Sequence, residues 1–250
     1  MTAIVGILCQ DGVIIGTDSS ATFSSGRMPT VEQPIEKLLI VQNSIIIAGT
    51  GQVGLGQRFE AIVNKLWDSR VFSSRITPME ITKRLTTETI KDFSQTFAPK
   101  EQYSALVAFP TNGTFHLCEF ALSDFQPELK TPRLWYASLG STQLITDSFL
   151  ALMRDIFWTG GPPPLSDGIF AATWALNHAI DVNPGGVNKP IRIAVLEPKG
   201  DGVLKAELLK DTQLAEHQQN IDGAKNALRK YCQTLNQHNE GETPNIPKPL

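Results

Sequence analysis

The chain has 250 residues, of which 41% are hydrophobic and 19% charged, and its formal net charge is −3. This composition is typical of a globular protein with a substantial core, and the weak negative charge provides no basic surface for nucleic acid. No apolar run reaches the roughly 18 residues that a membrane-spanning helix needs. The N-terminus also lacks the basic segment, apolar stretch and cleavage site of a secretory signal.

The cysteines and histidines of the sequence indicate neither disulfide bonds nor a zinc site. The three cysteines are scattered and odd in number, which disfavours a disulfide framework and favours a reduced, cytoplasmic protein. The four histidines have no spacing typical of zinc ligands. We therefore expect neither a metal nor another cofactor.

Strands are expected at the start of the chain. Two apolar runs, 2–9 and 12–18, flank the dipeptide Asp11-Gly12, which is the strongest short-range signal for a β-hairpin. The polar stretch 19–34 is expected to be a loop. Residues 37–51 are expected to form two further strands.

Two helices and a second hairpin follow. Apolar residues at helical spacing predict one helix at 53–69 and another from Pro78 to about residue 97. The segment 103–122 predicts a hairpin around the turn Asn112-Gly113. A linker rich in proline and charge then leads to a strand at 134–139.

The second half of the chain repeats this order of elements. Helices are expected at about 142–157 and 167–180, separated by a proline-rich loop. A last strand pair lies within 189–209, and a polar helix follows to about Gln233. The final residues are rich in Pro and Asn and poor in apolar residues, which indicates disorder.

These elements predict an α+β fold in a single main domain. Strands arrive as hairpins, so the sheets should be antiparallel, and helices arrive in pairs. The arrangement that suits both is a four-layer αββα sandwich of two antiparallel sheets. We assign residues 1–210 to this domain, 211–236 to a C-terminal helical extension and 237–250 to a disordered tail.

Thr2 is the first candidate for chemistry. If Met1 is removed, which a small second residue ordinarily permits, the α-amine of Thr2 becomes free. Its ordinary pKa is about 7.7–8.0, so it can accept the proton of the Thr2 hydroxyl and activate that hydroxyl as a nucleophile. The alternative is that Thr2 only begins a buried hairpin.

Three further residues could complete such a site. Asp18 ends the strand that pairs with the first one, so it can lie beside Thr2. Lys37 begins the next strand, and its charge would favour a neutral amine. Gly51 ends a strand before a helix, where backbone N–H groups can stabilise an oxyanion. Each has a structural alternative: a loop-opening aspartate, a solvated lysine and a turn glycine.

Together these residues resemble the proteasome β-type subunits and their bacterial relatives among the N-terminal nucleophile hydrolases, such as HslV, Anbu and the betaproteobacterial proteasome homologue. The resemblance rests on "TAIVGILCQDGVIIGTDSSAT" and "KLLIVQNSIIIAGTG". It implies an N-terminal nucleophile hydrolase fold with Thr2 as nucleophile, Asp18 and Lys37 as its charged partners and Gly51 as oxyanion donor.

The same resemblance implies further site residues. Thr22 matches the position whose backbone binds substrate as an added strand, and Gly49 stands where a larger specificity residue is common, which suggests a roomy or shallow pocket. The segments "YASLGST" and "NHAIDVNPGG" suggest Ser141 and Asp181 near Thr2. Two positions depart from the family pattern, Ser20 for Arg and Pro184 for Ser.

The resemblance implies a threonine-type peptidase that acts on peptides or unfolded proteins inside homo-oligomeric rings. Outer helices such as 52–68 would then bury apolar surface between subunits, and an unfoldase or ATPase could act as partner. Two other functions stay open: an inactive, structural ring subunit, and an amidohydrolase of the same fold that acts on small amides.

Overall fold

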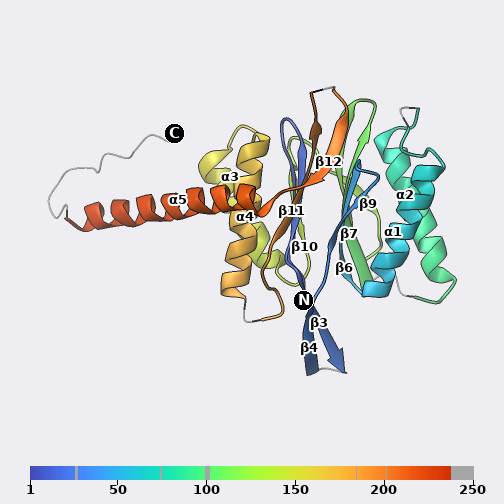
Figure 1. The fold of residues 1–250 in the computed structure, drawn as a ribbon, viewed down its shortest axis with the longest axis horizontal. Helices are drawn as coiled ribbons and strands as arrows, with labels where there is room; N and C mark the ends of the chain where they lie inside the picture. Colours follow the sequence, from blue (N-terminus) through green and yellow to red (C-terminus); the bar gives the residue numbers. More distant parts are fainter. Residues whose placement is uncertain (26–27, 74, 99–101, 184, 201, 238–250) are drawn as a thin grey trace.

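The computed structural model describes residues 1–25, 28–73, 75–98, 102–183, 185–200 and 202–237. Within them the chain forms two five-stranded sheets, a two-stranded ribbon and long helices on both sides (Figure 1). The tail that we expected to be disordered, 237–250, lies outside these residues except for Gln237.

The first sheet contains the two ends of the main domain. Its strand order is β10-β1-β2-β11-β12, and every neighbouring pair is antiparallel. The strands are β1 (Ile4–Leu8), β2 (Val13–Thr17), β10 (Tyr136–Leu139), β11 (Arg192–Pro198) and β12 (Leu204–Leu208). The predicted hairpin around Asp11-Gly12 is therefore present as β1 and β2.

The second sheet is built from consecutive strands. Its order is β5-β6-β7-β8-β9, again antiparallel throughout. The strands are β5 (Leu38–Val41), β6 (Ile45–Gly51), β7 (Tyr103–Thr111), β8 (Thr114–Phe120) and β9 (Pro127–Leu129). The short strand β9 lies in the stretch that we expected to be only a linker.

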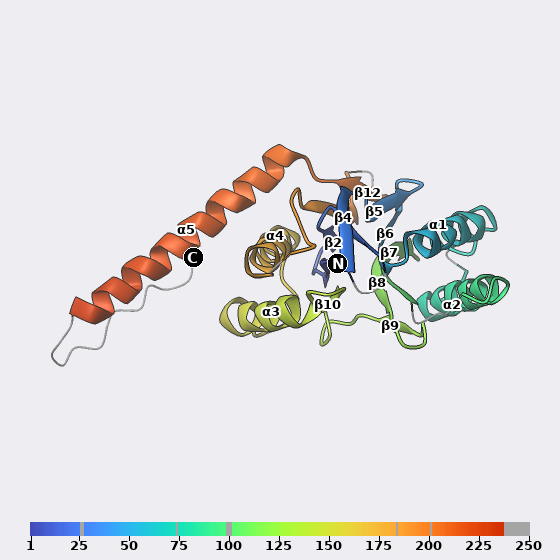
Figure 2. The ribbon, with the colours of Figure 1, turned by 90° about the horizontal axis from the view of Figure 1, so that it is seen from below.

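Helices cover the outer faces of both sheets (Figures 1 and 2). The second sheet is covered by α1 (Val53–Asp68) and α2 (Pro78–Ser94), and the first by α3 (Gln143–Phe157) and α4 (Leu165–Val182). A long helix, α5 (Asp211–Gln237), follows β12 and ends four residues later than expected. The predicted four-layer αββα sandwich is confirmed.

The core shows why these sequences form two stacked sheets. Along β6 the buried residues alternate: Ile46 and Ala48 face the first sheet, whereas Ile45 and Ile47 pack with α1 and α2. Side chains of a strand alternate between its two faces, so an entirely apolar strand fits a layer that is covered on both sides. The strands β1 and β2 are buried along their whole length for the same reason.

The stretch 19–34 is not a loop, as we expected, but a β-ribbon. The strands β3 (Ser20–Ser25) and β4 (Met28–Pro34) pair with each other and project from the sandwich beside the N-terminus (Figure 1). The prolines and polar residues suggested a loop. A two-stranded ribbon tolerates them, because each strand has an outer edge where a missing N–H breaks no ladder bond.

Phe59 of α1 is central to the core between α1, α2 and the second sheet. Its ring is fully buried and lies 5.6 to 5.9 Å from the rings of Tyr103, Phe120 and Phe125. We expect Phe59→Ala to lower the free energy of unfolding by about 3–5 kcal/mol, since it leaves a cavity among these rings. Chemical denaturation would measure this. The matched control Phe97→Ala, at a position 94% exposed, should change stability by only about 0.5 kcal/mol. Equal losses in both variants would contradict the assignment of the core.

Candidate active site

Thr2 is held between two neighbouring strands. It directly precedes β1, whose register pairs Ile4 with Thr17 of β2 and with Leu139 of β10. The end of β2 and the end of β10 therefore lie on either side of Thr2. The N–H of Asp18 continues the pairing by donating to the carbonyl oxygen of Ala3 at 3.1 Å.

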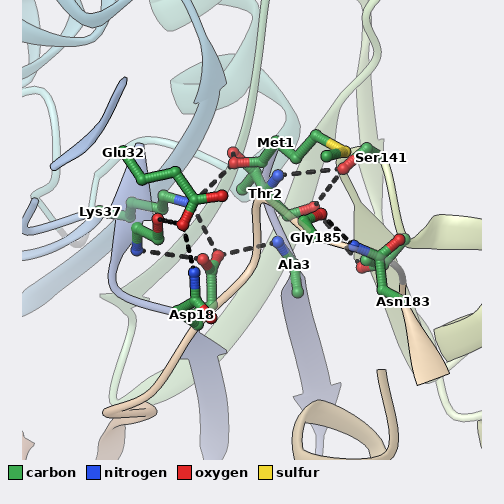
Figure 3. Close-up of polar contacts among 12 residues, drawn as sticks. Met1, Thr2, Ala3, Asp18, Glu32, Lys37, Ser141, Asn183 and Gly185 are labelled. Atoms are coloured by element: carbon green, nitrogen blue, oxygen red, sulfur yellow. Dashed lines mark hydrogen bonds and ion pairs between the residues drawn. The ribbon is translucent and has the colours of Figure 1, made fainter. Parts of the chain in front are cut away.

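Asp18 and Lys37 form an ion pair inside the protein (Figure 3). The Lys37 Nζ lies 2.7 Å from Asp18 Oδ1, and the two side chains are 6% and 0% exposed. The carboxylate also accepts hydrogen bonds from the backbone N–H groups of Ala3, at 2.9 Å, and Ser20, at 3.1 Å. Burial lowers the pKa of Lys37 and the negative charge of Asp18 opposes that shift.

Lys37 also reaches the N-terminal residues. Its Nζ donates to the carbonyl oxygen of Met1 at 3.0 Å, and the hydroxyl of Thr2 donates to the same oxygen at 2.8 Å. The ammonium and the hydroxyl therefore converge on one point. Burial, followed by the charge of Lys37, lowers the pKa of the α-amino group of Met1, while Asp18 and Glu32 act in the opposite direction.

Ser141 lies on the other side of Thr2. The backbone N–H of Thr2 donates to the Ser141 hydroxyl oxygen at 3.1 Å, and that hydroxyl lies 3.4 Å from the Thr2 carbonyl oxygen (Figure 3). The preceding residue, Gly140, has a φ of +97°, and a Cβ there would lie 2.2 Å from the Thr2 carbonyl oxygen. Only glycine allows this approach. Sequence reasoning missed Gly140, although a glycine ending a strand before Ser141 was the available signal.

The site opens into a cleft of about 1320 Å³. Its lining contains six of the predicted site residues, namely Thr2, Thr22, Lys37, Gly49, Gly51 and Ser141. Asp18 is fully buried and supports Lys37 from below the cleft surface. The structure thus brings seven of the eight predicted residues to one place.

Two glycines of β6 shape the floor of the cleft. Gly51 has a φ of +122°, and a Cβ there would lie 2.0 Å from the carbonyl oxygen of Gln102. A Cβ at Gly49 would lie 2.2 Å from the hydroxyl oxygen of Tyr103. The Tyr103 ring therefore occupies the space that a side chain at position 49 would take.

Thr22 lies on β3 at the edge of the cleft. Within the described part of the chain, β3 pairs with β4 alone, so its other edge has no partner strand there. The Thr22 hydroxyl oxygen is buried and makes no hydrogen bond to any described residue. An unpaired strand edge beside a cleft can accept an extended chain through backbone hydrogen bonds.

Asp181 is the one predicted site residue for which no contact with the described residues around Thr2 is found. It lies exposed near the end of α4, outside the hydrogen bonds described around Thr2. Its role stays a prediction, and Pro184 lies outside the described residues. Among the ranges that the structure describes, no group of three or more His, Cys, Asp or Glu side chains could hold a metal ion. No helix in those ranges is long and apolar enough to cross a membrane.

An αββα sandwich whose first strand places a threonine against a buried Lys–Asp pair is the fold of the N-terminal nucleophile hydrolases. The family model described as "Proteasome subunit" matches residues 2–123. Over this stretch, just under half of its length, the chain is similar to proteasome subunits. The matched stretch contains Thr2, Asp18, Lys37 and Gly51, whereas Ser141 lies beyond it.

Two solved structures of Anbu share the fold. A mutant of Anbu from Hyphomicrobium sp. strain MC1 is 12% identical, with a TM-score of 0.70 over 97% of this chain and 100% of that one. Anbu, described as an ancestral beta-subunit, from Yersinia bercovieri is 11% identical, with a TM-score of 0.68 over 99% of this chain and 100% of that one. No curated protein is significantly similar to the chain.

The buried Lys37–Asp18 pair leads to a prediction about the free energy of unfolding, which can be tested without an activity assay. Asp18→Asn removes the only carboxylate described in contact with the Lys37 ammonium, so we expect it to lower the free energy of unfolding by about 3–5 kcal/mol. Denaturant titration would measure the change. The control Glu80→Gln breaks an exposed ion pair with Arg84 and should cost only about 0.5 kcal/mol. Similar small losses in both variants would show that the buried pair does not hold the site together.

Proposed function

We propose that the chain is the subunit of a cytoplasmic, self-compartmentalising threonine peptidase. Removal of Met1 would expose Thr2 as the nucleophile. The observation that carries this proposal is that the Thr2 hydroxyl and the Lys37 ammonium lie close together, since both donate to the carbonyl oxygen of Met1, while the Thr2 N–H donates to the Ser141 hydroxyl. A purely structural role for Thr2 requires none of these contacts.

The proposed reaction begins at the Thr2 hydroxyl. The free α-amine takes the hydroxyl proton while the oxygen attacks the carbonyl carbon of a peptide bond. Lys37 favours the neutral amine and stabilises the negative charge that develops on the attacking oxygen. The backbone N–H of Gly51 is the proposed donor to the tetrahedral oxyanion.

The second half of the reaction releases the products. The protonated amine gives its proton to the leaving peptide nitrogen, which leaves an ester between Thr2 and the acyl part of the substrate. Water then attacks that ester, the amine again takes up and returns one proton, and the free hydroxyl is restored. Ser141, bound to the Thr2 nitrogen, is proposed to hold the amine in position; Asp181 has no assigned step.

The shape of the cleft favours a peptide over a small amide. Its volume of about 1320 Å³ exceeds the roughly 300–1,000 Å³ of typical small-molecule pockets. The unpaired edge of β3 at Thr22 offers ladder hydrogen bonds to an extended substrate. Proteasome-like subunits generally form oligomeric rings, which would keep such a site away from folded cytoplasmic proteins. An unfoldase or ATPase that delivers substrate remains part of this proposal.

The first test is the intact mass of the purified chain before and after treatment with a peptide electrophile that reacts with N-terminal threonine. We expect loss of Met1 and one adduct per chain, because the free amine activates the Thr2 hydroxyl. Thr2→Ala should form no adduct and should lower peptide cleavage about a thousandfold or more. Thr2→Ser keeps a hydroxyl and should still react.

The control for this test is Thr87→Ala, which removes an exposed threonine of α2 and should react as the natural chain does. A chain that keeps Met1 and forms no adduct would contradict the proposal and favour an inactive ring subunit. Adduct formation without peptide cleavage, but with hydrolysis of small amides, would favour the amidohydrolase.

The pH dependence of kcat/KM provides a second test, since it reports the pKa of the free enzyme's base. Burial and the charge of Lys37 lower the pKa of the α-amino group of Met1 below its ordinary value of 8.0. Because Lys37 also lies close to Thr2, we expect a shift in the same direction for the free α-amine of Thr2. The neutral amine is the active form. Cleavage should therefore rise with pH and reach half of its maximum below pH 8.0. A midpoint above this value would contradict the proposed role of Lys37.

A further inference from the structure

The helix α1 brings a carboxylate to the cleft. Its lining residues include Val53, Gly56 and Glu60, which follow one another at intervals of three and four residues and so lie on one side of the helix. Phe59, directly before Glu60, belongs to the buried stripe of the same helix. Glu60 therefore lies at the border between the core and the cleft, and it is half-buried there.

The Glu60 carboxylate has no cation beside it. Among the described residues Glu60 makes no ion pair, and no side chain there donates a hydrogen bond to its carboxylate. The basic residues of α1 are engaged elsewhere. Arg58 pairs with Asp92 at 2.7 Å, and Lys65 pairs with Glu88 at 3.2 Å. An unpaired, half-buried carboxylate is unfavourable, so a cation that enters the cleft is stabilised beside it.

The Tyr103 hydroxyl lies in the same part of the cleft. Tyr103 lines the cleft although it is only 3% exposed, and its hydroxyl makes no hydrogen bond within the ranges that the structure describes. A Cβ at Gly49 would lie 2.2 Å from this oxygen and a Cβ at Gly56 3.8 Å from it, so the hydroxyl lies between β6 and α1. Burial, followed by the charge of Glu60, raises the pKa of Tyr103. The carboxylate and the hydroxyl are therefore neighbours.

The other charges of the cleft leave it negative. Lys37 is neutralised by Asp18 at 2.7 Å, and Glu119 is neutralised by Lys130 at 2.6 Å. Glu36 lines the cleft, is exposed and forms no ion pair with a described residue. The unpaired charges that the described residues bring to the cleft are thus all negative, so it attracts cations and repels anions.

Gly49 links this part of the cleft to the proposed reaction, on which the inference rests. Gly51, the proposed oxyanion donor, holds the carbonyl group that Thr2 attacks. Gly49 precedes it by two residues on β6, so it faces the same side of the sheet about 7 Å away. A substrate side chain that starts beside that carbonyl group passes over Gly49 and reaches Tyr103 and Glu60.

We propose that Glu60 determines the specificity of the cleft and that the chain cleaves peptides after arginine or lysine. The charged end of that residue lies between the Glu60 carboxylate and the Tyr103 hydroxyl. A guanidinium group carries several N–H donors in fixed directions, so it can bond the carboxylate and the hydroxyl together. An ammonium group acts as a single point charge. Arginine is therefore the better of the two residues.

Fluorogenic peptides that differ only in the residue before the cleaved bond test this specificity. The residues compared are arginine, citrulline, which has nearly the same shape without the charge, and glutamate. We expect kcat/KM to be about 10–100-fold higher for arginine than for citrulline, and lower for glutamate than for citrulline. Glu60→Gln should remove most of these differences, and Glu60→Lys should make glutamate the best of the three.

The control variants separate a specific contact from other causes. A cleft damaged by substitution would cleave all three peptides slowly, so the reversal in Glu60→Lys cannot come from damage. Glu80→Gln, which changes an exposed carboxylate of α2, should leave the preference unchanged. If Glu36→Gln removes the preference as fully as Glu60→Gln does, the general charge of the cleft is the cause and the assignment to Glu60 is wrong.

Binding to a chain that cannot react separates this inference from the proposed reaction. In Thr2→Ala, a labelled arginine peptide should bind about 10–100-fold more tightly than its citrulline counterpart, as measured by fluorescence anisotropy, and adding Glu60→Gln should make the two equal. Cleavage without a preference for arginine would support the peptidase and overturn the role of Glu60. Preferential binding without cleavage by the natural chain would support Glu60 and overturn the peptidase. A chain that neither binds nor cleaves these peptides would overturn both.

Discussion

The buried ion pair of Asp18 and Lys37 is the interaction on which the site depends. Asp18 follows β2 in the first sheet, and Lys37 precedes β5 in the second. The pair therefore joins the two sheets at the edge where the chain begins. Desolvation of two charges is costly, but the N–H groups of Ala3 and Ser20 satisfy the remaining carboxylate positions. The position of the ammonium beside Thr2 is thus set by the packed sheets and not by a surface loop.

The strand order of the first sheet explains why distant residues meet at Thr2. Because β1 lies between β2 and β10, Asp18 reaches the site from one neighbour and Ser141 from the other. The approach of Ser141 also requires close contact between Gly140 and the carbonyl oxygen of Thr2. A side chain at position 140 would prevent that contact. Three strands and one glycine therefore fix the surroundings of the Thr2 nitrogen and hydroxyl, and the proton transfer proposed above would need such pre-organisation.

Local patterns predicted the fold and also the proximity of Asp18 and Lys37 to the N-terminal residues. The turn at Asp11-Gly12 fixes the pairing that carries Asp18 to Thr2, so their proximity follows from sequence alone. The β3–β4 ribbon could not be predicted, because its polar residues and prolines are equally compatible with a loop. Tyr103 was missed because the space over Gly49 depends on a neighbouring strand, and a single sequence shows no such tertiary contact. Asp181 was placed by a short motif without any pairing to support it.

The low sequence identity between this chain and Anbu is explained by the tolerance of hydrophobic cores to substitution. Cores accept many combinations of apolar residues when volume and pattern are kept, so a sandwich of this kind survives at 12% identity. Chemistry is less tolerant, since it needs particular atoms at particular distances. The family match covers residues 2–123, and this stretch contains the threonine and its ion pair.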